Sequence, residues 1–88
     1  MFTIQFTKMY KCGRDEPIEQ ARGFIINRTK SELIVFTTFD KAVEYLTNEM
    51  GYKPVKDMEN KFIGNESTMS GGYEYFYTLY EIKGVEVQ

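Results

Sequence analysis

The chain has 88 residues, with 11 Lys plus Arg, 13 Asp plus Glu, one cysteine and no histidine. This length predicts a single domain, 1–88, too small for the cleft of most enzymes, and a net charge of −2 offers no positive excess for binding nucleic acid. Because histidine is the commonest general base and metal ligand, its absence leads us to expect no catalytic residue, no metal site and no cofactor.

The single cysteine, Cys12, indicates a reducing compartment, because it cannot form a disulfide within the chain. Without a histidine to activate it, Cys12 is a weak candidate nucleophile. The first eleven residues alternate apolar with polar side chains and do not resemble a signal peptide, and no apolar run is long enough to cross a bilayer. We therefore expect a cytoplasmic protein with no membrane segment.

The N-terminal residues predict a half-buried β-strand. Phe2, Ile4 and Phe6 alternate with polar residues, and this period of two is typical of a strand over residues 2–10. The pattern then breaks at turn residues, so that residues 11–22 are predicted to form a loop.

Two apolar, β-branched runs follow, at 23–27 and 32–37. Four polar residues, 28–31, separate them, and this spacing is typical of a β-hairpin with a polar tip. Because both runs are nearly continuous in apolar residues, we expect their strands to lie near the centre of the sheet.

Residues 38–51 predict the one amphipathic helix. Thr38 is suited to cap its first turn, and Gly51 to end it in a conformation with positive φ. The apolar residues recur at the helical period and should form one buried stripe. The stripe consists of Phe39, Ala42, Val43, Leu46 and Met50.

After the helix the patterns are weaker. Pro54 cannot donate a hydrogen bond to a neighbouring strand, so a strand within 52–58 should lie at an edge of the sheet. Residues 61–63 predict a short strand, and the glycine- and serine-rich residues 64–72 predict a loop.

Residues 73–83 form the longest predicted strand, and they are apolar on both faces. Tyr73, Tyr75 and Tyr77 should point to one side of the sheet. The other side should carry Phe76, Tyr80 and Ile82.

Together these elements predict an α+β fold with an antiparallel sheet of four to five strands. Their order is β-β-β-α-β-β, and the helix packs on one face of the sheet. A single helix cannot cover both faces, so the tyrosine row on residues 73–77 should need another molecule to cover it.

This uncovered row suggests a surface for binding a protein, because tyrosines are enriched at interface hot spots. We expect the contact surface to contain Tyr73, Tyr75 and Tyr77 with the loops around Arg14 and Met69. A homodimer formed through the same row would also cover these tyrosines.

Two other functions fit parts of the pattern. The tyrosines could stack the bases of single-stranded nucleic acid, although the lysines near them are balanced by carboxylates, which makes such a partner unlikely. A small enzyme or small-molecule binder, with a pocket between helix and loop, is the third alternative.

The chain also resembles a class of proteins. It is rich in Lys, Ile, Asn, Phe and Tyr and has only two alanines, Ala21 and Ala42. In size and composition it is similar to small accessory proteins of low-GC bacteria, their phages and mobile elements. The resemblance implies a non-enzymatic protein that binds and blocks a host enzyme, as anti-CRISPR proteins do.

Overall fold

The structure, a computed structural model, describes residues 1–85. The elements in chain order are β1 (Phe2–Cys12), β2 (Ile18–Phe24), β3 (Ile26–Asn27), β4 (Glu32–Leu33), α1 (Phe39–Glu44), the π-helical segment η1 (Tyr45–Glu49), β5 (Lys53–Pro54), β6 (Lys61–Met69), the 3₁₀ turn η2 (Ser70–Gly72) and β7 (Glu74–Gly84).

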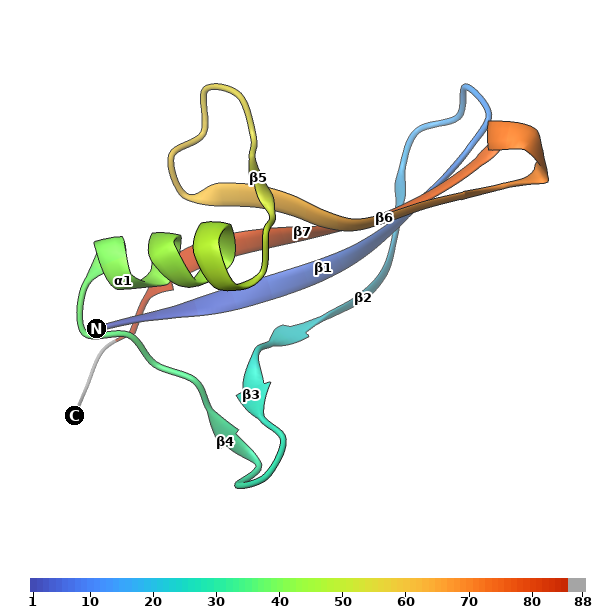
Figure 1. The fold of residues 1–88 in the computed structure, drawn as a ribbon. Coiled ribbons are helices and arrows are strands. Elements are labelled where there is room, and N and C mark those ends of the chain that lie inside the picture. The colour runs from blue at the N-terminus through green and yellow to red at the C-terminus, as the bar shows by residue number, and fades with distance from the viewer. Residues whose placement is uncertain (86–88) are drawn as a thin grey trace.

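The main sheet is antiparallel and has five strands in the order β2-β1-β7-β6-β5. Its central pair is β1 with β7, which are hydrogen-bonded along their whole length, from Phe2 opposite Gly84 to Cys12 opposite Glu74. The helical segment lies on one face of this sheet, and β3 and β4 form a separate small hairpin (Figure 1). The predicted α+β class, with one helix on an antiparallel sheet, is therefore confirmed.

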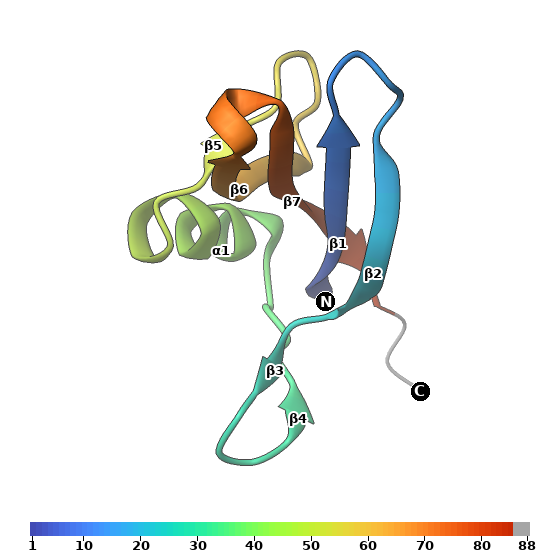
Figure 2. The ribbon, with the colours of Figure 1, turned by 90° about the vertical axis from the view of Figure 1, so that its right-hand side faces the viewer.

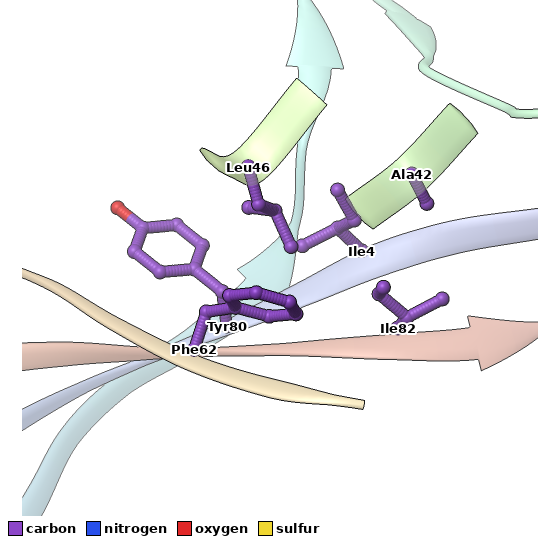
Figure 3. Close-up of a cluster of buried hydrophobic side chains, with 6 residues drawn as sticks. All are labelled: Ile4, Ala42, Leu46, Phe62, Tyr80 and Ile82. Carbon is purple, nitrogen blue, oxygen red and sulfur yellow. The ribbon is translucent and has the colours of Figure 1, made fainter. Parts of the chain in front are cut away.

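The core lies where the helix meets the sheet. Ala42 and Leu46 of the helical segment and Ile4 of β1 are each 0 % exposed. Figure 3 shows these side chains directed toward one another, with Ile82 of β7 beside them and the Tyr80 hydroxyl pointing away from the cluster. The helix forms here because Thr38 caps it, its hydroxyl oxygen accepting a hydrogen bond of 3.2 Å from the Lys41 N–H.

The helical stripe was predicted correctly except at its end. From Tyr45 the segment is a π-helix, and the Met50 N–H donates to the Tyr45 carbonyl at 3.1 Å. The Thr47 hydroxyl also donates to the Val43 carbonyl at 2.9 Å and competes with the α-helical ladder. An i→i+5 turn holds more residues than an α-turn, so Met50 rotates off the stripe and is 43 % exposed. Gly51 then ends the helix with φ 70°, as expected.

The prediction of a loop over residues 11–22 was wrong in its second half, where β2 begins at Ile18. Its sequence, IEQARGF, has few strand-favouring residues and no alternation. It forms because β1 offers it an unpaired edge, and a β-bulge at Lys8/Met9 interrupts the pairing. Almost all of β2 is exposed, as expected of an edge strand.

The prediction that the hairpin strands are central was also wrong. Gly23 and Phe24 of the first run belong to the edge strand β2. The remaining residues pair as strands only at Ile26–Asn27 and Glu32–Leu33, in a hairpin outside the main sheet, and these four residues are exposed. The hairpin is tied to the sheet mainly by backbone hydrogen bonds, such as Ile25 N–H to the Ile4 carbonyl at 3.0 Å. The main sheet is completed by β2 and β6 instead.

The predicted loop at residues 64–72 begins too early, because β6 continues to Met69 and only η2 is a turn. Part of the segment predicted to be a loop instead forms a β-bulge between Gly64 and Ser67, within the pairing of β6 with β7. Asn65 lies in the bulge with φ 52°, a conformation that asparagine tolerates well. The prediction for Pro54 was correct, since it lies in the two-residue edge strand β5.

The molecule is elongated, measuring 45 × 28 × 22 Å. Its radius of gyration is 14.2 Å, where a compact chain of this length has about 12 Å. Its accessible surface is 6466 Å², and a typical monomer of this mass exposes about 5,400 Å². The chain thus leaves more surface in contact with water than its size requires. In the part of the chain described, no helix is both long and apolar enough to span a membrane.

Candidate functional site

One end of the sheet extends well beyond the helix, and we call residues 9–21 and 66–77 the distal arm. It contains the outer halves of β1, β6 and β7, the start of β2 and the two loops that join them (Figure 1). Both ranges are fully described, and none of their residues is buried. The distal arm is therefore a projecting sheet without a core of its own.

All five residues predicted for a protein interface lie in the distal arm. Arg14 is in the loop after β1, Met69 ends β6, and Tyr73 precedes β7. The Gly13 N–H donates a hydrogen bond of 2.7 Å to the Tyr73 carbonyl, which brings the loop of Arg14 against the η2 turn. Tyr73 and Met69 are 62 % and 58 % exposed, so the tip presents large apolar side chains to solvent.

Tyr75 and Tyr77 stand on the face of β7 opposite the helix. Their rings stack with centroids 5.0 Å apart and an angle of 27° between the planes. Across the strand pair they lie beside Lys11 and Met9 of β1. Both tyrosines are half-buried, and burial together with the Glu66 carboxylate raises the pKa of Tyr75. The stacked pair is thus partly desolvated and partly exposed to solvent.

A hydrogen-bonded cluster fixes the tip of the distal arm. The Tyr10 hydroxyl donates to one oxygen of the Glu74 carboxylate at 2.7 Å, and the Ser70 hydroxyl donates to the other at 2.9 Å. These bonds lower the pKa of Glu74, the Tyr10 bond contributing most, and the same contact raises the pKa of Tyr10. The Tyr10 ring also packs on Phe76, with centroids 4.9 Å apart. The tip is therefore held by polar contacts where a hydrophobic core is lacking.

The distal arm is acidic. It contains only two basic side chains, Lys11 and Arg14. Two of its carboxylates are hydrogen-bonded: Glu74 accepts from Tyr10 and Ser70, and Glu19 accepts from Arg22, which lies just outside the arm. The five carboxylates of the arm are Asp15, Glu16, Glu19, Glu66 and Glu74. With this balance the arm does not present its tyrosines beside the kind of basic groove that base-stacking surfaces use.

Cys12 is partly buried at the end of β1, next to the loop of Arg14. Within residues 1–85, no three His, Cys, Asp or Glu side chains lie close enough together to hold a metal ion. The carboxylates of the distal arm are thus spread over its surface.

The sequence suggested one contact surface made of the tyrosine row and the loops around Arg14 and Met69, but it did not show how these segments come together at the tip of a projecting arm. That proximity depends on the full-length pairing of β1 with β7. The displaced hairpin also leaves a groove beside the helix, on the inner face of the sheet, and the sequence suggested a pocket in this region only as part of its third alternative, without its lining residues. Comparison of the chain with protein-family models, curated proteins and solved structures finds no match.

Proposed function

We propose that this protein is a non-enzymatic protein-binding module whose contact surface is the distal arm. The observation that carries the proposal is the exposure of large apolar and aromatic side chains on a projecting sheet end that has no buried residue. Aromatic side chains with few rotatable bonds bury much area at low entropic cost, which suits them as interface anchors. Tyr73 and the stacked Tyr75 and Tyr77 would be these anchors.

The excess accessible surface supports the same proposal. A chain that exposes about 1,000 Å² more than a typical monomer of its mass has area available for a standard interface, which takes roughly 800 Å² from each partner. The distal arm is narrow and projects from the body, so it could enter a concave site on the partner. The resemblance to phage and mobile-element accessory proteins favours a host enzyme as partner, blocked by the inserted arm.

A second copy of the chain is the alternative partner for this surface, and the two copies would contact each other through the stacked tyrosines. A small homodimeric structural protein would use the same residues and would also reduce the exposed area. Single-stranded nucleic acid is disfavoured as a ligand, because two cations face five carboxylates on the distal arm.

A matched pair of methionine variants tests the proposal. Met69→Ser changes the tip of the distal arm, and Met58→Ser changes a comparably exposed residue, 45 % against 58 %, in the β5–β6 connection. The full chain is used to capture proteins from lysate of the source organism, and a captured protein is purified and recombined with it. Size-exclusion chromatography with light scattering then gives the mass of the complex.

We expect a complex of defined stoichiometry that Met69→Ser and Tyr77→Ser weaken and Met58→Ser leaves intact. A homodimer with the same sensitivity would assign the distal arm to self-association. Two results would overturn the proposal: a complex that responds to Met58→Ser and not to the arm variants, or tight binding of a single-stranded oligonucleotide at low salt that weakens as salt rises.

A further inference from the structure

A groove of about 510 Å³ lies on the inner face of the sheet, beside the helical segment and next to the base of the distal arm. Its walls are the end of the helical segment, the β3–β4 hairpin and the first half of β1, and Figure 2 shows the helix and the β1–β2 pair on opposite sides, with the hairpin below. The volume is within the range of about 300–1,000 Å³ typical of small-molecule sites.

The groove is lined mainly by apolar side chains. Phe24, Ile26 and Met50, each more than two-fifths exposed, contribute to it, and Phe6 and Leu46 lie deeper. Exposed apolar side chains contributed by three separate elements form a continuous concave surface here. An apolar ligand body would remove this surface from water.

The charged residues of the groove are all of one sign. Lys8 of β1 and Arg28 of the hairpin line it, and of the described residues around it none is Asp or Glu. This contrasts with the whole chain, where carboxylates outnumber basic side chains by 13 to 11. Both side chains are long enough to extend a cationic head toward a ligand while their stems contact apolar surface.

A hydrogen-bond donor without an acceptor lies in the same groove. The Tyr80 and Tyr52 hydroxyls are 3.1 Å apart, and the Asn65 amide donates to both, at 2.6 Å and 3.4 Å. Only one of the two hydroxyl protons can form the bond between the tyrosines. Tyr80 is the donor in this bond, so the remaining proton is that of the partly buried Tyr52 hydroxyl, which donates to no other group among residues 1–85.

We propose that this groove binds a small amphipathic carboxylate, whose apolar body contacts the groove and whose anionic head meets Lys8, Arg28 and the tyrosine pair. The carboxylate would accept charge-assisted hydrogen bonds from the two cations and the remaining hydroxyl proton. The groove borders the base of the distal arm but shares no residue with it, so this proposal can be tested independently of the protein-binding proposal.

Three eight-carbon probes that share an apolar tail test the site: octanoate, octan-1-ol and octylammonium. They are titrated into the isotope-labelled full chain and followed by amide NMR shifts. We expect octanoate to saturate shifts at groove residues, to bind more tightly than octan-1-ol, and octylammonium to bind most weakly. Arg28→Gln and Lys8→Gln should each weaken the binding of octanoate about two- to fivefold, as expected for partly exposed ion pairs, and should leave the binding of octan-1-ol unchanged.

Two further variants make the test sharper. Met50→Glu places a carboxylate in the groove at an exposed position and should reverse the preference, so that octylammonium binds more tightly than octanoate. Lys83→Gln removes an exposed cation that does not line the groove and should leave octanoate binding unchanged. Because octan-1-ol binding reports an intact groove, loss of folding is distinguishable from loss of charge.

The proposal is overturned if octanoate binds no more tightly than octylammonium, or if the shifts centre on the tip of the distal arm and not on the groove residues. It is also overturned if no probe saturates and the groove signals depend on protein concentration, because a second copy of the chain would then occupy the groove.

Discussion

The two ends of the central strands β1 and β7 differ sharply although the pairing between them is continuous. At the helix end, Ile4 and Ile82 are opposite each other and are 0 % and 4 % exposed. At the other end, Lys11 and Tyr75 are also paired, and no residue of the distal arm is buried. Backbone pairing alone therefore does not create a core, and burial depends on what covers the sheet.

This difference assigns separate roles to the two ends. The helix end supplies most of the hydrophobic stabilisation, because the buried residues cluster there. The distal arm depends on its connection to that end and on polar contacts such as the Tyr10–Glu74 bond. A region with little burial can lose local structure at low cost, which is compatible with adjustment to a partner. Variants at the two ends should accordingly have very different effects on unfolding.

The largest effect is expected for Leu46→Ala, which creates a cavity between helix and sheet. Leu46 is 0 % exposed, and such substitutions cost about 2–5 kcal/mol in the free energy of unfolding. Leu33→Ala is the control, because Leu33 lies on the hairpin and is 42 % exposed. Urea denaturation measures both. If the two variants lost the same free energy of unfolding, the helix end would not contain the stabilising core.

Gly64→Ala should have the next largest effect. A Cβ atom at Gly64 would lie 2.1 Å from Cδ1 of Tyr52, so the Tyr52 ring would have to move from its stacked position on Tyr80. We expect a loss of about 1–3 kcal/mol, the range for overpacking, together with a change in tyrosine near-ultraviolet circular dichroism. Gly84→Ala is the control, because nothing lies within 4 Å of its Cβ position.

A double-mutant cycle sharpens this result. If the clash with the Tyr52 ring is the cause, Gly64→Ala should lower the free energy of unfolding much less in a Tyr52→Ala background than in the wild type. A Gly64→Ala cost that is the same with and without the Tyr52 ring would contradict this explanation.

Thr38→Ala should cost about 1 kcal/mol, because it removes the side-chain cap of α1. The effect belongs to the helix end, so native-state hydrogen exchange should accelerate at core amides and stay unchanged at distal-arm amides that open locally. Thr37→Ala, next to the cap, should have little effect, since the Thr37 hydroxyl only contacts the exposed Lys41 ammonium. Uniform acceleration across the molecule would mean that the two ends open as one unit.

The parts of the fold that the sequence predicted well have strong local periodicity. The helix and β1 follow from their apolar spacing, and Tyr75 and Tyr77 of β7 follow in the same way. Tyr73 was predicted in the same strand, but it precedes β7 with a helical backbone conformation. β2 could not be predicted, because its sequence carries no period of two and it is ordered by pairing with β1. The strand predicted at 61–63 was too short, because Gly and Asn residues, which favour loops, here form a bulge within the longer strand β6.

The candidate site was predicted in part for the same reason. Tyr75 and Tyr77 share a face because of a local period, whereas the meeting of Arg14 with Tyr73 depends on pairing across more than fifty residues of chain. A pocket between the helix and a loop was only the third alternative, and its lining residues were not predicted, because its walls exist only where the hairpin leaves the sheet and where the π-turn rotates Met50. Neither event has a signal in hydrophobic periodicity.

The smallest effect on overall stability is expected for Tyr10→Phe, at the tip of the distal arm. The Tyr10 hydroxyl is the main cause of the lowered pKa of Glu74, so its removal should raise that pKa toward the ordinary value for glutamate. Carboxyl NMR titration measures this shift directly. Tyr77→Phe is the control, because the Tyr77 hydroxyl makes no bond to Glu74 and its loss should leave the titration unchanged.

The sign of the pH dependence follows from the lowered pKa. A carboxylate whose pKa is lower in the folded state stabilises that state at neutral pH, and this contribution disappears as the pH falls from the ordinary glutamate value through the folded one. In acid, the wild-type tip should therefore lose the clamp between Tyr10, Ser70 and Glu74, whereas the Tyr10→Phe tip should change less. Amide exchange at the tip should respond to acid while the amides around Leu46 do not. If acid loosened the amides around Leu46 together with those of the tip, the two ends of β1 and β7 would be one cooperative unit after all.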